Sequence, residues 1–162
     1  MKQIWDFSQT VDIDDVKEIL DRQITCNMAI ANEGIHNSYG ANIGHVILNM
    51  DSDCVKTRAK AYAAAGSDAR MNGCELPVVI NSGSGNQGIT CCVPVVVYAK
   101  ELDCTQEQLY RALVLSNLTA IYIKTGIGTL SAFCGAVSAG AAAGAGIAYL
   151  HNGTYKEIQH TI

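Results

Sequence analysis

The sequence predicts an all-α fold, in which helices surround a buried helix that is rich in glycine and alanine. Three observations lead to this prediction. Apolar residues recur at helical spacing along most of the chain, and residues that favour helix starts precede several of these segments. Only residues 76–80 (LPVVI) are typical of a β-strand, and a single strand cannot form a sheet.

The length and composition fit one helical domain over residues 1–162. Of its residues, 49% are apolar and 16% are charged, as is usual for globular proteins. The net charge is −4 and Lys and Arg form no cluster, so nucleic acid is not an expected partner. Residues 1–15 contain no apolar signal segment, and the cytoplasm is therefore the expected compartment.

The first expected helix has one continuous apolar face. It begins at a capping residue, Asp12 or Asp14, and ends at Gly34. The residues on its apolar face are Val16, Ile19, Leu20, Ile24 and either Met28 or Ala31. A short second helix is expected over residues 43–50, where apolar residues again follow helical spacing.

Later helices are indicated by their start and stop signals. An alanine-rich helix follows the capping residues at 51–53 and closes at residues 72–73, an Asn-Gly pair. Thr105 and Gln108 stand in capping-box spacing before the next helix, which Gly126 is expected to end. Residues 155–162 place apolar side chains on one helical stripe, and the chain then stops without a cap or breaker, as expected for an excised domain.

Residues 126–150 contain no charge and are long enough to cross a bilayer. Most of them are alanine or glycine, which gain little from transfer into lipid. We therefore expect a buried central helix from about Ser131 to Leu150. Gly140 and Gly144 are expected to let neighbouring helices approach it closely.

The segment VVINSGSGNQGITCCVP, residues 78–94, contains the glycine spacing of a dinucleotide-binding turn. That motif works only inside a βαβ unit, and here the pattern that follows is helical. The segment still places small side chains, N–H groups and amides before a helix start, which suits a carboxylate or another small anion. The residues concerned are Ser82, Gly83, Ser84, Gly85, Asn86 and Gln87. The alternative is a solvent-exposed loop that only connects two helices.

The chain has seven cysteines and no C-x-x-C pair. An odd number at irregular spacing predicts neither a disulfide framework nor a local zinc site, and most of the thiols are expected to be small buried side chains. Cys134 stands near the start of the glycine-rich helix. Because the positive end of a helix dipole favours thiolate, the form that binds metal, Cys134 is the best single candidate ligand.

Three blocks of the sequence together resemble the L-cysteine desulfidase family, a distant relative of the iron-sulfur L-serine dehydratase alpha chain. They are CNMAIANEG (26–34), SDARMNGCELPVVINSGSGNQGITCCVPVVVYA (67–99) and LSAFCGAVSAGAAAGAGIAYL (130–150). The resemblance implies a lyase that removes ammonia and either hydrogen sulfide or water from a small amino acid to give pyruvate. It also implies a [4Fe-4S] cluster held by cysteines, whose open iron acts as a Lewis acid on the leaving group.

Carried over to this chain, the family's LSA-x-CG block makes Cys134 a cluster ligand. The other family ligands lie in GCTEP and CDGAK motifs, and neither motif occurs here. The chain thus resembles a domain from the C-terminal half of a longer protein, without its N-terminal half and its C-terminal segment. By itself it is expected to be inactive and to hold no stable cluster, unless another of its thiols substitutes. The thiols considered for that role are Cys26, Cys74, Cys91 and Cys92.

The resemblance also implies roles for polar residues. It favours contact between the loop at 82–87 and the carboxylate and ammonium of the substrate. Lys124 is a candidate acid/base or carboxylate partner, the alternative being a cation at the C-terminal end of its helix. Asp68 and Arg70 either line the site or pair with each other.

Two other classes of function stay open at this point. One is a cluster-free module that binds an amino acid through the glycine loop, and the other is a structural or membrane-embedded helical domain. The sequence does not distinguish cysteine from serine as substrate, and a homo-oligomer is left open.

Overall fold

The computed structural model describes residues 1–128 and 134–162. Within these two ranges the chain forms eight helices and no strand, which confirms the all-α prediction. The helices are α1 (Lys2–Thr10), α2 (Ile13–His36), α3 (Ile43–Leu48), α4 (Val55–Met71), α5 (Gly85–Glu101), α6 (Gln106–Ile127), α7 (Gly135–Leu150) and α8 (Tyr155–Thr161).

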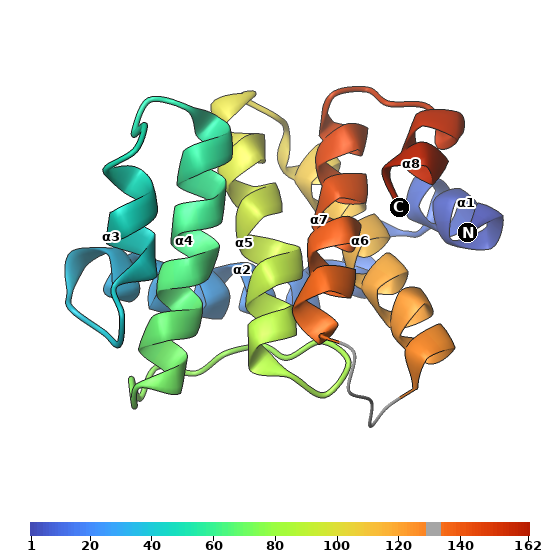
Figure 1. The fold of residues 1–162 in the computed structure, drawn as a ribbon. Coiled ribbons are helices and arrows are strands. Elements are labelled where there is room, and N and C mark those ends of the chain that lie inside the picture. The colour runs from blue at the N-terminus through green and yellow to red at the C-terminus, as the bar shows by residue number, and fades with distance from the viewer. Residues whose placement is uncertain (129–133) are drawn as a thin grey trace.

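The helices are arranged in two layers. In Figure 1, α3, α4, α5 and α7 stand side by side in the front layer, while α2 crosses behind them and α6 lies behind α7. The short helices α1 and α8 meet at one end, where Trp5 packs against Tyr149 and Tyr155 with ring centroids 6.1 and 6.2 Å apart. Both chain termini lie at this end of the molecule (Figure 1).

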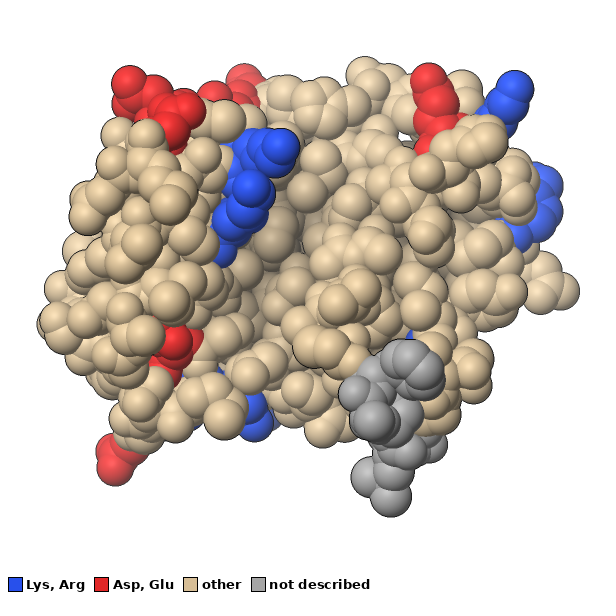
Figure 2. Space-filling model, viewed as in Figure 1, with Lys and Arg blue, Asp and Glu red and all other residues tan. Residues whose placement is uncertain are grey.

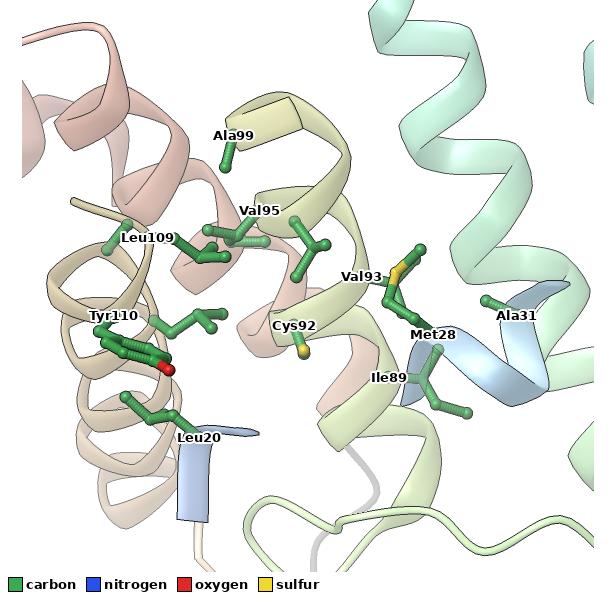
Figure 3. Close-up of a cluster of buried hydrophobic side chains, with 14 of the residues drawn as sticks. Leu20, Met28, Ala31, Ile89, Cys92, Val93, Val95, Ala99, Leu109 and Tyr110 are labelled. Atoms are coloured by element: carbon green, nitrogen blue, oxygen red, sulfur yellow. The ribbon is translucent and has the colours of Figure 1, made fainter. Parts of the chain in front are cut away.

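The centre of the core belongs to α5, which contacts α2, α4, α6 and α7. Its side chains Ile89, Val93 and Val95 have no exposed surface. Figure 3 shows Ile89 and Val93 directed toward Met28 of α2, and Val95 on the side of α6. Close packing of such branched side chains is the main source of stability in a domain of this size.

The glycine-rich helix α7 lies beside α5 rather than at the centre, and this corrects the expected position. One face of α7 is buried, and its small residues there are Ser138, Ala139, Ala142, Ala143, Ala145 and Gly146. The close approach to α6 occurs at Gly146, where an added Cβ would lie 2.9 Å from the Ala112 carbonyl oxygen. A Cβ at Gly140 would meet nothing within 4 Å, and one at Gly144 would meet only Thr161.

The expected helix caps are largely present. Asp12 accepts a hydrogen bond from the Asp14 N–H at the start of α2, and Thr105 and Gln108 form a capping box at α6. The expected ends differ by a few residues, because α2 continues past Gly34 and α6 continues to Ile127. Ile19 is 62% exposed and does not belong to the buried face of α2.

Residues 76–80 are extended but form no strand, in contrast to the expectation for this segment. Val79 pairs instead with a side chain: its N–H donates to Asn27 Oδ1 over 2.8 Å, and its carbonyl accepts from Asn27 Nδ2 over 3.1 Å. The buried Asn27 amide therefore takes the place that a neighbouring strand would occupy in a sheet.

The described parts of the chain contain no helix with both the length and the apolar character needed to span a bilayer.

Candidate functional site

The glycine segment folds as a tight turn followed by a helix. Asn81 and Ser84 exchange two backbone hydrogen bonds of 3.1 and 3.0 Å around the turn. Between them, Ser82 and Gly83 both have positive φ values, 50° and 80°, which is the conformation of a type I′ turn. Ser84 then caps α5, and its side chain accepts a hydrogen bond from the Gln87 N–H.

The other two glycines of the motif are required for close packing. A Cβ at Gly85 would clash with the guanidinium of Arg70, and a Cβ at Gly88 would clash with the carbonyl oxygen of Val79. The motif thus combines one glycine in a turn with two at helix contacts, and no strand follows it in the described part of the chain. The prediction that this is not a dinucleotide fold is consistent with the all-α architecture.

The turn is held to the bundle by a network of three amides, two of them buried, that the sequence analysis missed. The Asn81 amide donates to Asn117 Oδ1 on α6 over 2.9 Å. Asn117 and Gln23 of α2 in turn exchange hydrogen bonds of 2.8 and 2.9 Å. The only signal in the sequence is the presence of amides within otherwise apolar helix faces. Because each amide is paired, the network fixes the position of Ser82 with little freedom.

Arg70 and Asp68 do not form a pair with each other in the structure. Asp68 accepts a hydrogen bond of 2.8 Å from the Ile43 N–H at the start of α3. Arg70 extends toward the glycine segment, where its Nη1 donates to Asn86 Oδ1 over 3.1 Å. Pairing of the two is therefore not seen: Arg70 lies beside the glycine segment, whereas Asp68 binds the start of α3.

Cys134 lies beside the same segment. It occupies the N-cap position of α7, and its side chain is exposed. A Cβ at the next residue, Gly135, would clash with the side-chain amide of Gln87, which places the first turns of α5 and α7 in contact. Both helices begin at the lower end of the bundle in Figure 1, so their positive dipole ends lie together.

Three hollows adjoin this end of the bundle, and the first, of about 290 Å³, is lined by residues 79–82 and by apolar side chains of α1, α2 and α6. The second, of about 190 Å³, is lined by Ser82, Ile121, Lys124 and Thr125, so the structure brings Lys124 next to the turn. The third, of about 340 Å³, is mostly apolar and is lined in part by Cys134. Its other lining residues are Ile123, Ile127, Val137, Ser138, Ala141 and Ile162. Lys124 also stands in the last turn of α6, so its charge is favourable there in either role.

The remaining thiols differ in their suitability as ligands. Cys91 and Cys92 are fully buried in α5, and burial raises the pKa of Cys91 to about 12. Burial likewise raises the pKa of Cys92, and this disfavours at both positions the thiolate form that binds metals. At the N-cap of α4, hydrogen bonds from the Thr57 and Lys56 backbone lower the pKa of Cys54.

A [4Fe-4S] cluster needs several thiolates that converge on one point. Across residues 1–128 and 134–162, no three His, Cys, Asp or Glu side chains gather closely enough to hold a metal ion. Among the described thiols, the start of α7 offers the single exposed one, Cys134. The exposed Cys134 therefore fits the role of one ligand of such a cluster.

Charged side chains are sparse on the face formed by α4, α5 and α7 (Figure 2). Those that show lie mostly toward the upper and lower edges of this view. This face is therefore nearly neutral, and the positive ends of α5 and α7 lie below it.

Comparison with known proteins relates this chain to longer ones. It is 61% identical to a UPF0597 protein of Desulfitobacterium hafniense over 162 residues, which are 100% of this chain and 38% of that protein. Identity is 59% to a UPF0597 protein of Lachnoclostridium phytofermentans, over 98% of this chain and 38% of the relative. For a UPF0597 protein of Finegoldia magna it is 51%, over 100% of this chain and 39% of the relative.

The chain thus spans about 38% of the length of the curated relatives that it matches. No solved structure matches it significantly. The sequence model of one family, described as serine dehydratase alpha chain, matches residues 2–162. The match extends over nearly the whole sequence, and the chain therefore belongs to the serine dehydratase alpha chain family.

Proposed function

We propose that the full-length protein is an iron-sulfur amino-acid lyase of the L-cysteine desulfidase or L-serine dehydratase type. It would release pyruvate, ammonia and either hydrogen sulfide or water. The observation that carries this proposal is the contact between Gln87 and Gly135, which joins the glycine segment to the helix start at Cys134. Family membership supports the same chemistry.

In this proposal the residues of the chain bind and orient the substrate. The turn at Ser82 and the first turn of α5 face the carboxylate, since helix N-termini bind anions, and the side-chain amides of Asn86 and Gln87 provide acceptors for the ammonium. Lys124, in the hollow next to Ser82, serves as acid/base or as a second carboxylate partner. Cys134 is one thiolate ligand, and a bound [4Fe-4S] cluster would supply a Lewis acid for the leaving thiol or hydroxyl.

The test uses the full-length protein purified without oxygen. We expect it to release pyruvate and ammonia from L-cysteine or L-serine, with sulfide only from cysteine. The comparison of the two substrates decides between desulfidase and dehydratase. Binding of either amino acid without turnover, in a protein that takes up no iron and sulfide on reconstitution, would favour the cluster-free binding module instead.

A further inference from the structure

Four large apolar side chains from separate segments are exposed around one hollow, the one of about 290 Å³. They come from α1, α2, the extended segment before the glycine turn and α6, and they are Phe7, Ile19, Ile80 and Ile121. Each is between 43% and 62% exposed in the described part of the chain. Single exposed apolar residues are ordinary on a protein surface, whereas a group of them around one hollow marks a contact surface.

The apolar face of α2 is wider than the surface that the bundle covers. Ile19 stands at helical spacing with Val16 and next to Leu20, so the three share one side of the helix. The bundle buries Leu20 and leaves Ile19 exposed at the hollow. An apolar helix face that its own domain covers only in part is completed by a contact outside that domain.

The polar side chains that line the hollow are already paired with one another. Gln23 and Asn117 exchange two hydrogen bonds, and the Asn81 amide donates to Asn117. The Ser82 hydroxyl donates to Asn81 Oδ1 over 2.8 Å. None of the described residues that line the hollow is charged. The hollow therefore favours apolar side chains and disfavours a polar metabolite such as an amino acid.

The length of the relatives identifies the occupant. The chain covers about 38% of the UPF0597 proteins that it matches, so more than half of each of those polypeptides lies outside the matched region. A segment of the same polypeptide is tethered, and its effective concentration at the hollow is on the order of millimolar. Such a segment occupies an apolar surface more readily than a second copy of the protein in dilute solution, and contacts between domains of one chain are commonly of this kind.

We infer that the remainder of the full-length polypeptide packs into this hollow, with its own apolar side chains against the four exposed ones. The inference does not depend on the proposed lyase activity. Ser82 and Ile121 also line the neighbouring hollow that contains Lys124. The docked segment therefore lies next to the proposed substrate site.

Photo-crosslinking of the full-length protein tests the inference. The photoreactive residue p-benzoylphenylalanine takes the place of Phe7, which it resembles in shape. In the matched control it takes the place of Lys60, an exposed residue of α4 that does not line the hollow. From Phe7 we expect crosslinks to residues outside the 162-residue region, in a product that keeps the mass of one polypeptide. From Lys60 we expect none.

Thiol labelling provides a second measurement, which needs no crosslinker. Ile19→Cys and Ile80→Cys replace exposed side chains, so both variants should fold. In the native full-length protein both new thiols should react with a maleimide at least about tenfold more slowly than the thiol of Lys60→Cys, because a covered group reacts only after local opening. In guanidinium the three rates should converge. Mass spectrometry of digested samples separates the new thiols from the seven native ones.

Three results would overturn the inference. Crosslinks from Phe7 only at the mass of two polypeptides, or protection that is lost on dilution, would assign the hollow to a second copy. Labelling of Ile19→Cys and Ile80→Cys as fast as Lys60→Cys would leave the hollow open to solvent. A small apolar molecule crosslinked at Phe7 would make it a ligand pocket. Ammonia release by the same protein is a separate measurement, so the lyase proposal and this inference can fail independently.

Discussion

At the scale of single residues, replacement by alanine is expected to have opposite effects on stability at two helical glycines. Gly88→Ala places a methyl group against the Val79 carbonyl, and we expect a loss of about 1 to 3 kcal/mol in the free energy of unfolding. Gly140 is exposed on α7, and a Cβ there meets nothing within 4 Å. Gly140→Ala should therefore stabilise by about 0.5 to 1 kcal/mol, through helix propensity alone.

Urea denaturation of the two variants beside the wild type measures both effects. A Gly140→Ala protein less stable than the wild type would show that α7 packs against something on its exposed side. This outcome would restore the closely packed position that the sequence suggested for Gly140.

The thiols also differ from one another in pKa and in burial, and their rates of alkylation measure this difference. Backbone N–H groups at the start of α4 lower the pKa of Cys54, whereas burial raises the pKa of Cys104. Because the thiolate is the nucleophile, Cys54 should react with iodoacetamide faster than Cys104 near neutral pH, and the buried Cys91 and Cys92 should react last. Mass spectrometry of digested samples gives the order. In guanidinium the four rates should converge, and equal rates in the folded protein would contradict the prediction.

The turn in the glycine segment was easier to predict from the sequence than the packing of its residues. The turn at Ser82 and Gly83 was expected, because small residues in this spacing favour turns. The packing tasks of Gly85 and Gly88 were not, since the groups that they approach belong to Arg70 and Val79, outside the motif. The paired amides at Asn81 and Asn117 could not be predicted either, because they join segments that are far apart in the sequence.

At the scale of elements, α8 depends on a capping box that responds to acid. The Thr154 N–H and hydroxyl donate to Glu157 and lower the pKa of its carboxyl group. A carboxyl whose pKa is lower in the folded state stabilises it above the unfolded pKa, and this contribution is lost as pH falls through the folded pKa. We therefore expect Glu157→Gln to lower the Tm at pH 6 by a small amount.

The difference between the two proteins should vanish as the pH falls below the ordinary carboxyl range near 4.5. Thermal melts followed by circular dichroism between pH 3 and pH 6 test this. A difference that stays constant over this range would show that the charge of Glu157 does not contribute.

Helix starts were predictable where a cap is a local signal. Asp12 and Thr105 fulfil the expected roles because the bonds that they make lie within three residues. The end of α2 was placed too early because Gly34 is a packing glycine, and an added Cβ there would clash with Ala65 of α4. Residues 76–80 lack strand pairing for a similar reason, since their partner is the side chain of Asn27. Such partners are set by tertiary contacts, which local patterns do not contain.

At the scale of the whole molecule, the site follows from the alternating directions of four helices. The ends of α4 and α6 and the starts of α5 and α7 all lie at the lower end of the bundle in Figure 1. This arrangement brings Arg70, the turn at Ser82, Lys124 and Cys134 to one end, although they span 65 positions of the numbering, from 70 to 134. Short connections between consecutive helices favour antiparallel neighbours, so this convergence could have been inferred from the helix order. The central position of α5 could not, because it depends on how two layers pack.

The last prediction compares the 162-residue chain alone with a full-length protein in its iron binding and its release of ammonia. The chain spans about 38% of its curated relatives and, in the part that the structure describes, offers one exposed thiol at the site. A cluster of the proposed kind needs further thiolates, so we expect the 162-residue chain alone to release no ammonia from cysteine or serine.

In the full-length protein, Cys134→Ser should remove the visible absorbance and the bound iron of the cluster together with ammonia release. Cys104→Ser should change none of these, because that thiol lies before α6, at the other end of the bundle. If Cys134→Ser kept its iron, or if the isolated chain bound four irons and turned over cysteine, the ligands would have to be other thiols, and the role proposed for the start of α7 would be wrong.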